Sequence, residues 1–347
     1  MTARPERLSI TRKKRRLLRA YLARRPVWCA WQVTYRCSFR CRICGYWQEH
    51  HTPEEELSVE EFARGADNLA RAGSLLINLA GGEPFLRQDL APIVEVLARS
   101  HFPFVTTNGW HIRPRRAREV WAAGLWGVSV SIDYPDAPRH DAQRGIPGAF
   151  DEAVRALQVF RDTRTAAHQR VNLMAVLTAD NQDHVEGVVA LARHLGVNFM
   201  IQPYGALKTG DRSHLVDRPV AEELLRVHRR FPNFVSNPRF LARFDEASNG
   251  GVGDCQAGVS FFNIDERGDV SPCVELRRKV VVGNMLADDP REIARRLRRY
   301  RPRNNCRACW YNCRGEMESL YSMRGILAAM PNFWLKPGSS LGRPSGR

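Results

Sequence analysis

Three cysteines in one short loop constrain this chain more than any other feature of its sequence. Cys37, Cys41 and Cys44 are spaced as C-x3-C-x2-C, and a loop this short that closes around one small object directs its sulfur atoms inward. Thiolates select zinc, cuprous ion or iron–sulfur clusters. Three thiolates leave one iron of a four-iron cluster open, and an open iron can bind a substrate or a cofactor. The alternative is a zinc knuckle completed by His50 or His51.

The chain from Val27 to Gln202 alternates predicted strands with predicted helices. The predicted strands are Val27–Thr34, Leu75–Ala80, Phe104–Thr107, Val128–Ile132, Val171–Leu177 and Val197–Gln202. Four helices are predicted between these strands. One begins at a Ser58–Glu61 capping box, two run over Asp89–Ser100 and Gly148–Phe160, and one extends from a cap at Asp183 to Leu195. Six such units favour an α/β fold, a partial (β/α)6 TIM-like barrel. The chemistry of such a barrel belongs at the carboxyl ends of its parallel strands.

A second motif, Leu79–Pro84, follows the second predicted strand. Gly81 and Gly82 allow the backbone to approach a ligand closely because they lack a Cβ atom. Glu83 then offers a carboxylate to an ammonium group. An ordinary strand-to-helix turn is the alternative for this segment taken alone.

Further motifs follow the later strands. They are Thr106–Gly109, Ser129–Asp133, His140–Gly145 and Ile201–Tyr204. Together with the cysteine loop and the Gly-Gly-Glu-Pro turn, they occur in the order found in the radical S-adenosylmethionine (SAM) enzymes. About residues 27–320 of the chain resemble that family.

The resemblance implies a role for each matching residue. The cysteine loop would carry a [4Fe–4S] cluster, the Gly-Gly-Glu-Pro turn would grip the amino group of SAM, Ser131 would contact the cofactor and Arg144 would pair with its carboxylate. A guanidinium fork suits a carboxylate bidentately, which gives the Arg144 assignment a physical reason as well. The residues expected to bind the cofactor are Tyr46, Gly81, Gly82, Glu83, Pro84, Asn108, Ser131, Asp133, Arg144 and Gln202. Those expected to act in catalysis are Cys37, Cys41, Cys44 and Cys313.

Five more cysteines lie toward the carboxyl end. They are Cys255, Cys273, Cys306, Cys309 and Cys313. Between the first two, a turn at residues 266–268 joins two predicted strands into a hairpin. The segment resembles a twitch domain or a truncated SPASM domain, which implies one auxiliary iron–sulfur cluster. We expect the first four of these cysteines as its ligands, with Cys313 as an alternative ligand or a proton or hydrogen donor; a structural zinc site is the alternative.

The resemblance also implies the reaction. Reductive cleavage of SAM releases a 5′-deoxyadenosyl radical, which abstracts hydrogen from a substrate carbon. An auxiliary cluster that accepts an electron makes the net reaction an oxidation, of a peptide or a biosynthetic small molecule. Two other hypotheses stay open: a radical SAM enzyme acting on a lipid or lipid-linked substrate, and a non-catalytic metal-binding protein with a degenerate barrel. Intact Glu83, Ser131 and Arg144 argue against the last.

Two blocks contribute much of the formal net charge of +16. Residues 1–25 carry ten Arg or Lys and residues 291–314 carry nine Arg, each block against one Glu. Such blocks attract anions. We expect a flavodoxin- or ferredoxin-type reductant at the second block and no nucleic acid. For the first block, a basic amphipathic helix over Thr11–Arg25 can lie on an anionic membrane surface, pack on the barrel or remain a flexible arm.

The chain shows neither a secretory signal nor an apolar run long enough to span a membrane, so we expect a cytoplasmic protein, with the inner face of the membrane as a further location. Its nine cysteines then indicate metal ligands rather than disulfides, apart from Cys29, a buried core residue. The expected domains are a basic arm (1–24), the radical SAM partial barrel (25–246), the twitch/SPASM-like domain (247–325) and a disordered tail (326–347). A hinge is expected at Ala247–Gly253.

Overall fold

One sheet of nine strands organises the described part of the computed structural model, which covers residues 7–73, 75–301 and 304–321. The strands are β1 (Trp28–Thr34), β2 (Leu76–Gly81), β3 (Phe102–Thr107), β4 (Gly127–Ser131), β5 (Arg170–Leu177), β6 (Asn198–Pro203), β7 (Phe261–Ile264), β8 (Asp269–Ser271) and β9 (Gly283–Asn284). Their order is β6-β5-β4-β3-β2-β1-β7-β8-β9. The first six strands pair in parallel, each with its sequence neighbour, as the strand–helix alternation predicts.

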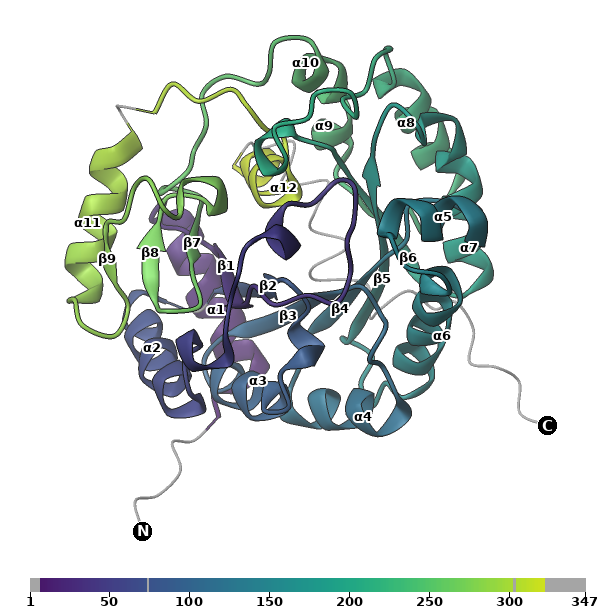
Figure 1. Cartoon of the computed structure of the whole chain (residues 1–347). Coiled ribbons are helices and arrows are strands. Elements are labelled where there is room, and N and C mark those ends of the chain that lie inside the picture. Colours follow the sequence, from purple (N-terminus) through teal and green to yellow (C-terminus); the bar gives the residue numbers. More distant parts are fainter. Residues whose placement is uncertain (1–6, 74, 302–303, 322–347) are drawn as a thin grey trace.

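Most of the helices form an outer ring around the strands, as Figure 1 shows. The helices are α1 (Ile10–Leu22), α2 (Val59–Ala72), α3 (Leu90–Ala98), α4 (Pro114–Ala123), α5 (Ala137–Arg144), α6 (Ala149–Asp162), α7 (Val185–His194), α8 (Ala221–Arg230), α9 (Pro238–Leu241), α10 (Phe244–Ser248), α11 (Pro290–Tyr300) and α12 (Asn312–Leu320). Helix α2 begins at the predicted capping box, in which Ser58 and Glu61 each bond the other's backbone N–H. Its Phe62 and Leu69 are buried against the sheet, and Cys29 of β1 is fully buried as expected.

Most predicted boundaries shift by one or two residues, and two of the differences have a physical reason. Strand β3 begins at Phe102 and includes Pro103, which lacks an N–H but accepts a hydrogen bond from Trp126 N at 2.7 Å. Asp183 does not cap α7: it lies in a 3-10 turn (Gln182–His184) and its carboxylate pairs with Arg218. A side chain engaged with a distant arginine cannot be recognised from local spacing.

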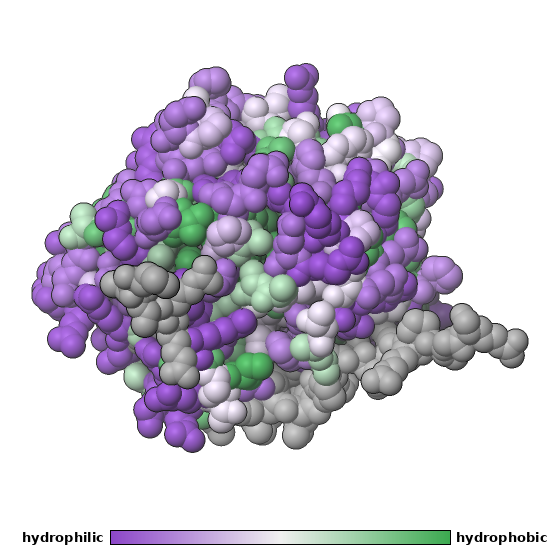
Figure 2. Space-filling model, turned by 90° about the horizontal axis from the view of Figure 1, so that it is seen from below, coloured by the Kyte–Doolittle hydropathy of each residue, from purple (hydrophilic) through white to green (hydrophobic). Residues whose placement is uncertain are grey.

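Helix α1 packs on the barrel, which is one of the three states that the sequence left open. Leu17 and Ala20 of α1 are buried with Phe102 and Trp126, at the amino ends of β3 and β4. Lys13 is only 2% exposed, and its ammonium donates to the carbonyl oxygens of Ala98, the last residue of α3, and of His101, which precedes β3. Among the described residues, no helix has both the length and the apolar character needed to cross a membrane. Figure 2 shows a mostly hydrophilic face with apolar side chains in small separate groups.

The carboxyl-terminal cysteine-rich segment continues the same sheet. Strand β7 pairs in parallel with β1 over four residues, and β7 and β8 form the predicted hairpin. The loop expected as a hinge packs against the cysteine-rich segment, because a Cβ atom on Gly251 would lie 2.0 Å from the carbonyl oxygen of Arg307. The domain boundaries and the hinge stay predictions, and the tail at 326–347 lies outside the described residues.

Candidate functional site

A cavity opens at the carboxyl ends of the parallel strands, where the sequence places the motifs. It encloses about 880 Å³ of space free of atoms, part of it open to solvent. All three cysteines of the C-x3-C-x2-C loop line it, together with residues that end β2, β3, β4 and β6. Of the predicted site residues, those in its wall are Cys37, Cys41, Cys44, Tyr46, Gly81, Gly82, Asn108, Ser131, Arg144 and Gln202. One cavity therefore brings together residues spread over 166 positions, from 37 to 202.

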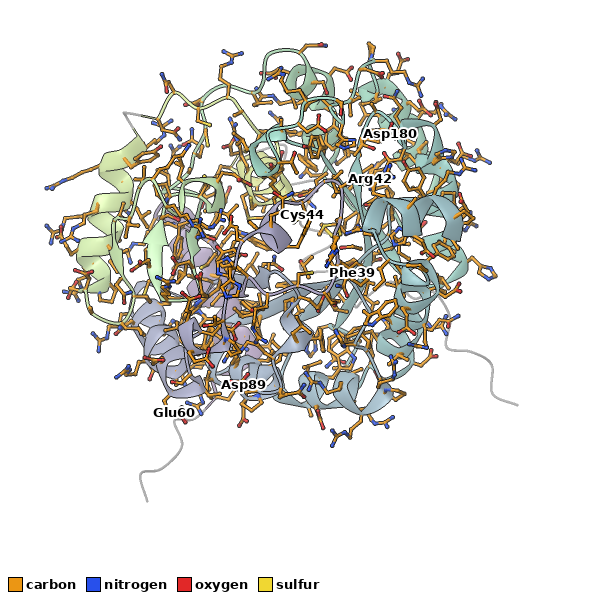
Figure 3. All side chains as sticks on the ribbon, viewed as in Figure 1. Phe39, Arg42, Cys44, Glu60, Asp89 and Asp180 are labelled. Atoms are coloured by element: carbon orange, nitrogen blue, oxygen red, sulfur yellow. The ribbon has the colours of Figure 1, made fainter. Side chains whose placement is uncertain are left out.

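The cysteine loop crosses the front of the barrel in the view of Figures 1 and 3. Figure 3 labels Phe39, Arg42 and Cys44 on this loop. Phe39 is buried and packs edge-on against Trp110, and the indole of Trp47 donates to the carbonyl oxygen of Cys41 at 3.2 Å. Burial raises the pKa of the Cys37 thiol to about 12 and also raises the pKa of Cys41. Thiols in such surroundings stay protonated near neutral pH, so a metal that binds here has to displace these protons.

The two glycines of the second motif are required by the chain's own backbone. A Cβ atom on Gly81, whose φ is +123°, would lie 1.9 Å from the carbonyl oxygen of Thr34. A Cβ atom on Gly82 would lie 2.0 Å from the carbonyl oxygen of Arg36. This close approach joins the end of β2 to the start of the cysteine loop. Gly82 N donates a hydrogen bond to Thr34 O at 2.8 Å, which stabilises the contact. The sequence attributed these glycines to a ligand's approach; the structure supplies this additional reason.

Glu83 and Pro84 lie outside the cavity wall. The Glu83 carboxylate is fully buried and accepts hydrogen bonds from Phe85 N, Thr107 Oγ1 and Asn108 N, at 2.9, 2.7 and 2.7 Å. Burial raises its pKa to about 7, although the three donors act in the opposite direction. In this arrangement Glu83 fixes the end of β3, and with it the wall residues Thr107 and Asn108. Direct binding of an ammonium group by Glu83 stays a prediction.

Arg144 reaches the cavity from the end of α5 and is held from behind by Asp133. Its guanidinium lies 2.6 Å from the Asp133 carboxylate, which also accepts from Gln143 Nε2 and Val176 N. Burial disfavours the positive charge, but Asp133 and the Cys41 sulfur outweigh it and raise the pKa of Arg144. Asp133 is absent from the cavity wall, so in this structure it orients the arginine.

The donors of the cavity fit the group that the resemblance implies. Asn108 Nδ2 and Arg144 Nε are buried without a hydrogen-bond partner in the described part of the chain. Buried donors without partners are costly, and a ligand that carries a carboxylate and other acceptors, as SAM does, would satisfy them. The three thiols of the same cavity are the donors that an iron–sulfur cluster needs. His50 and His51, the candidate fourth ligands of a zinc knuckle, do not line this cavity.

The five carboxyl-terminal cysteines gather outside the cavity wall, next to β7 and α12. After burial, which is the largest cause, neighbouring thiols raise the pKa of several of them: Cys313 acts on Cys273, Cys273 on Cys309, and Cys309 on Cys313. Cys255 acts on all three. Cys306 packs, like Cys273, against the cluster of Cys255 and Phe261. Among the described residues, no three His, Cys, Asp or Glu side chains are arranged as ligands of a single ion.

Sequence reasoning missed four residues of the cavity wall, Val176, Gly205, Lys208 and Tyr311, of which the last two have polar side chains. Lys208 ends a 3-10 turn (Ala206–Lys208) that follows β6, and Tyr311 lies between Cys309 and Cys313. Lys208 follows a strand at the same sheet edge as the other motifs, which was the available signal. Tyr311 comes from a distant segment and could be placed only by the fold.

Two family models match separate parts of the chain. Residues 31–192 match the radical SAM superfamily, and residues 255–314 match the SPASM iron–sulfur cluster-binding domain. An AdoMet-dependent heme synthase of Nitratidesulfovibrio vulgaris is 27% identical over 332 residues, covering 85% of this chain and 88% of the relative. Mycofactocin maturase MftC of Mycolicibacterium smegmatis is 28% identical over 312 residues, covering 84% and 77%.

Solved structures agree on the fold. SuiB of Streptococcus suis with bound S-adenosylmethionine matches with a TM-score of 0.60 at 15% identity, over 80% of this chain and 68% of SuiB. The native anSMEcpe structure with bound AdoMet matches with a TM-score of 0.62 at 15% identity, over 79% and 83%. At this identity the likeness establishes the shared architecture only.

Proposed function

We propose that this chain, which belongs to the radical SAM superfamily and carries a SPASM domain toward its carboxyl end, oxidises a peptide or a biosynthetic small molecule. The enzyme class, the [4Fe–4S] cluster, SAM and an auxiliary cluster follow from the two domains, as the motifs predicted. The oxidation and the substrate are the proposal. The observation that carries it is the single cavity in which the three cysteines meet Asn108 and Arg144.

The chain's own residues divide the binding work. Cys37, Cys41 and Cys44 would hold the cluster and leave one iron to SAM. Arg144, steadied by Asp133, would pair with the SAM carboxylate, and Asn108 would donate its unpartnered amide hydrogen. When bound, the two clusters and SAM supply one-electron cleavage of SAM, hydrogen abstraction from a substrate carbon and an acceptor for the electron that oxidation releases.

The apolar and aromatic part of the cavity wall serves the same chemistry. Phe39, Ile43 and Tyr204 are buried apolar or aromatic side chains in its wall. Such a lining limits water and groups that would quench a reactive species. Residue types of this kind bind the body of a cofactor, while the few polar groups fix its orientation.

Two substrate classes are supported by relatives. One relative is a heme synthase and another a mycofactocin maturase, and both align along most of this chain. A lipid substrate drew its support from the basic amino terminus, and the packing of α1 on the barrel removes part of that argument. A non-catalytic protein is disfavoured because the cysteines, Asn108 and Arg144 are assembled in one cavity. A flavodoxin- or ferredoxin-type reductant at the basic segment 291–314 remains part of the proposal.

The test is SAM cleavage by anaerobically reconstituted protein with dithionite. Wild type should form 5′-deoxyadenosine slowly without substrate, and the C37A/C41A/C44A variant should form none. Arg144→Met should raise the Kd for SAM by about tenfold or more, because a charge-assisted pair is worth about 1.5–3 kcal/mol. Arg115→Met, an exposed arginine on α4, is the control and should behave like wild type. No 5′-deoxyadenosine from cluster-loaded wild type under several reductants would refute the function.

A further inference from the structure

One end of the cavity carries a cation that the cofactor assignments leave unused. Among the described residues that line the cavity, Arg144 and Lys208 are the only basic side chains, and neither Asp nor Glu lines it. Arg144 already has Asp133 at 2.6 Å. Lys208 has no ion pair or hydrogen bond from its ammonium group to any described residue. Its ammonium instead lies over aromatic faces, 4.7 Å from the ring centre of Tyr46 and 5.9 Å from that of Tyr311.

The fold fixes Lys208 between the two cysteine groups. A Cβ atom on Gly45 would lie 2.5 Å from the carbonyl oxygen of Lys208, so the turn that carries Lys208 packs directly on the cysteine loop. On the other side, Tyr311 Oη donates to the carbonyl oxygen of Gly205 at 3.1 Å, which ties the same turn to the segment before α12. Lys208 is also close enough to Cys313 to affect its thiol. A group bound at Lys208 would therefore lie between the SAM cysteines and the auxiliary ones.

Tyr46 supplies a second, independent pointer to a ligand. It lines the cavity and is only 6% exposed, yet its hydroxyl has no hydrogen-bond partner in the described part of the chain. The Arg277 guanidinium lies 5.0 Å from the centre of its ring and is itself paired with Glu49. A buried hydroxyl without a partner is costly. The Glu275 carboxylate lies near enough to act on Tyr46 and Tyr311 but does not bond this hydroxyl. An ammonium group over the same ring therefore favours a ligand anion that can accept from both.

We propose that Lys208 and Tyr46 form a subsite that anchors a carboxylate of the substrate, which moves Tyr46 from the cofactor residues, where the sequence placed it, to the substrate. The inference rests on the proposed function in one respect: if Arg144 serves the carboxylate of SAM, a second cationic donor in the same cavity is left for the substrate. A planar carboxylate has two oxygens, one for the ammonium of Lys208 and one for the hydroxyl of Tyr46. The carboxylate could be a propionate of a tetrapyrrole or an acidic group of a peptide, and the recognition chemistry is shared.

Binding of carboxylate probes to the cluster-loaded enzyme, with SAM present and no reductant, tests the subsite without turnover. One arm uses metal-free coproporphyrin III, which has four carboxylates, and its tetraamide. The other uses an acetylated, amidated Ala-Glu-Ala-Glu peptide and its Gln analogue. Wild type should bind the acid form of at least one probe at least tenfold more tightly than its neutral partner. The arm that shows this preference identifies the source of the carboxylate.

The variants separate charge from shape. Lys208→Met should weaken binding of the acid probe by about tenfold or more, Lys208→Arg should restore most of it, and Tyr46→Phe should weaken it by about threefold to tenfold. Lys279→Met removes an exposed lysine as the control and should leave probe binding unchanged. Iron content and thermal midpoint confirm that each variant is folded.

Three results would overturn the subsite. Wild type could bind no acid probe in either arm, or bind acid and neutral forms equally. Lys208→Met could bind the acid probe as wild type does. Lys208→Met could weaken SAM binding as much as probe binding, which would place Lys208 in the cofactor site. Each can occur while wild type still produces 5′-deoxyadenosine, so failure of the subsite and failure of the proposed function are distinguishable.

Discussion

The two cysteine groups of this chain are built in opposite ways. Cys37, Cys41 and Cys44 come from one loop after β1, and the cavity contains all three. The five others come from separate segments, before β7, after β8, ahead of α12 and in its first turn, and the fold alone brings them together. A group encoded in one loop can be recognised from spacing, whereas the ligand set of an assembled group depends on which segments pack closest.

A buried arginine accompanies each cysteine group, and only one of the two arginines opens onto the cavity. Arg144 has a nitrogen without a partner and opens onto the cavity, so it is available to a ligand. Arg314 is fully buried and saturated: it pairs with Glu318 at 3.1 Å and donates to the carbonyl oxygens of Cys309, Val252 and Gly253. Arg314 therefore holds the carboxyl-terminal cysteines in place, while Arg144 serves binding.

Removing the first group should produce the largest effect. Wild-type protein should hold about eight irons per chain, four for each group, and C37A/C41A/C44A should hold about four. The remaining iron should still give the spectrum of a [4Fe–4S] cluster, because the second group does not depend on the loop. Iron analysis with electron paramagnetic resonance checks this. Four irons in wild type together with stoichiometric zinc would remove the auxiliary cluster.

Single substitutions in the second group should show which of its cysteines ligate the auxiliary cluster. A four-iron cluster needs four of the five cysteines. Cys309 lies near enough to Cys313 to act on its thiol, so we expect Cys313→Ser to lose up to about four irons and Cys306→Ser to keep them. The sequence favoured Cys306 as a ligand and Cys313 as the alternative, so this pair of variants decides between the two assignments. Loss of iron in Cys306→Ser alone would restore the sequence-based choice.

Truncating the Arg314 side chain should destabilise the carboxyl-terminal cysteine group more than the cysteine loop. Arg314→Met leaves the Glu318 carboxylate and three carbonyl oxygens without their donor, and breaking a buried pair costs about 3–5 kcal/mol. The thermal midpoint and the iron of the second group should fall, while SAM binding should persist. The double variant R314M/E318L should recover part of the loss, and exposed Arg299→Met is the surface control. An unchanged midpoint in Arg314→Met would show that the network does not support this region.

Much of the barrel could be predicted because its signals are local. Apolar runs between helix caps located the first six strands, and the motif order located ten cavity residues. What could not be predicted depends on contacts distant in sequence. Asp183 is engaged by Arg218, Glu83 is turned toward Thr107 and Asn108 rather than into the cavity, and Lys208 is aligned by Tyr46 and Tyr311. Spacing encodes which residues share a strand end, not which way each side chain turns.

A buried carboxyl group near each cysteine group gives the smallest and most discriminating prediction. Burial raises the pKa of both Glu83 and Glu316 to about 7. Glu316 of α12 accepts from Asn237 N at 3.1 Å. Its pKa in the unfolded chain is about 4.3, so between that value and about 7 the folded state retains a proton that the unfolded state has lost. The stability from this group is therefore complete below about pH 4 and is lost as the pH rises through 7.

Glu316→Gln should remove that dependence, because an amide stays neutral at every pH and can still accept from Asn237 N. The stability advantage of the variant over wild type should grow by about 2 kcal/mol between pH 5 and pH 8, a figure reduced from the full shift because the Glu316 residue keeps some exposure to solvent. Anaerobic thermal unfolding from pH 5 to pH 8 measures it, with exposed Glu119→Gln on α4 as the control. If Glu316→Gln and wild type lose stability in parallel as the pH rises, the proton resides elsewhere. Glu83, which lies under the first group, would then be the carboxyl group to test, and the pH sensitivity would belong to the cavity rather than to the assembled region.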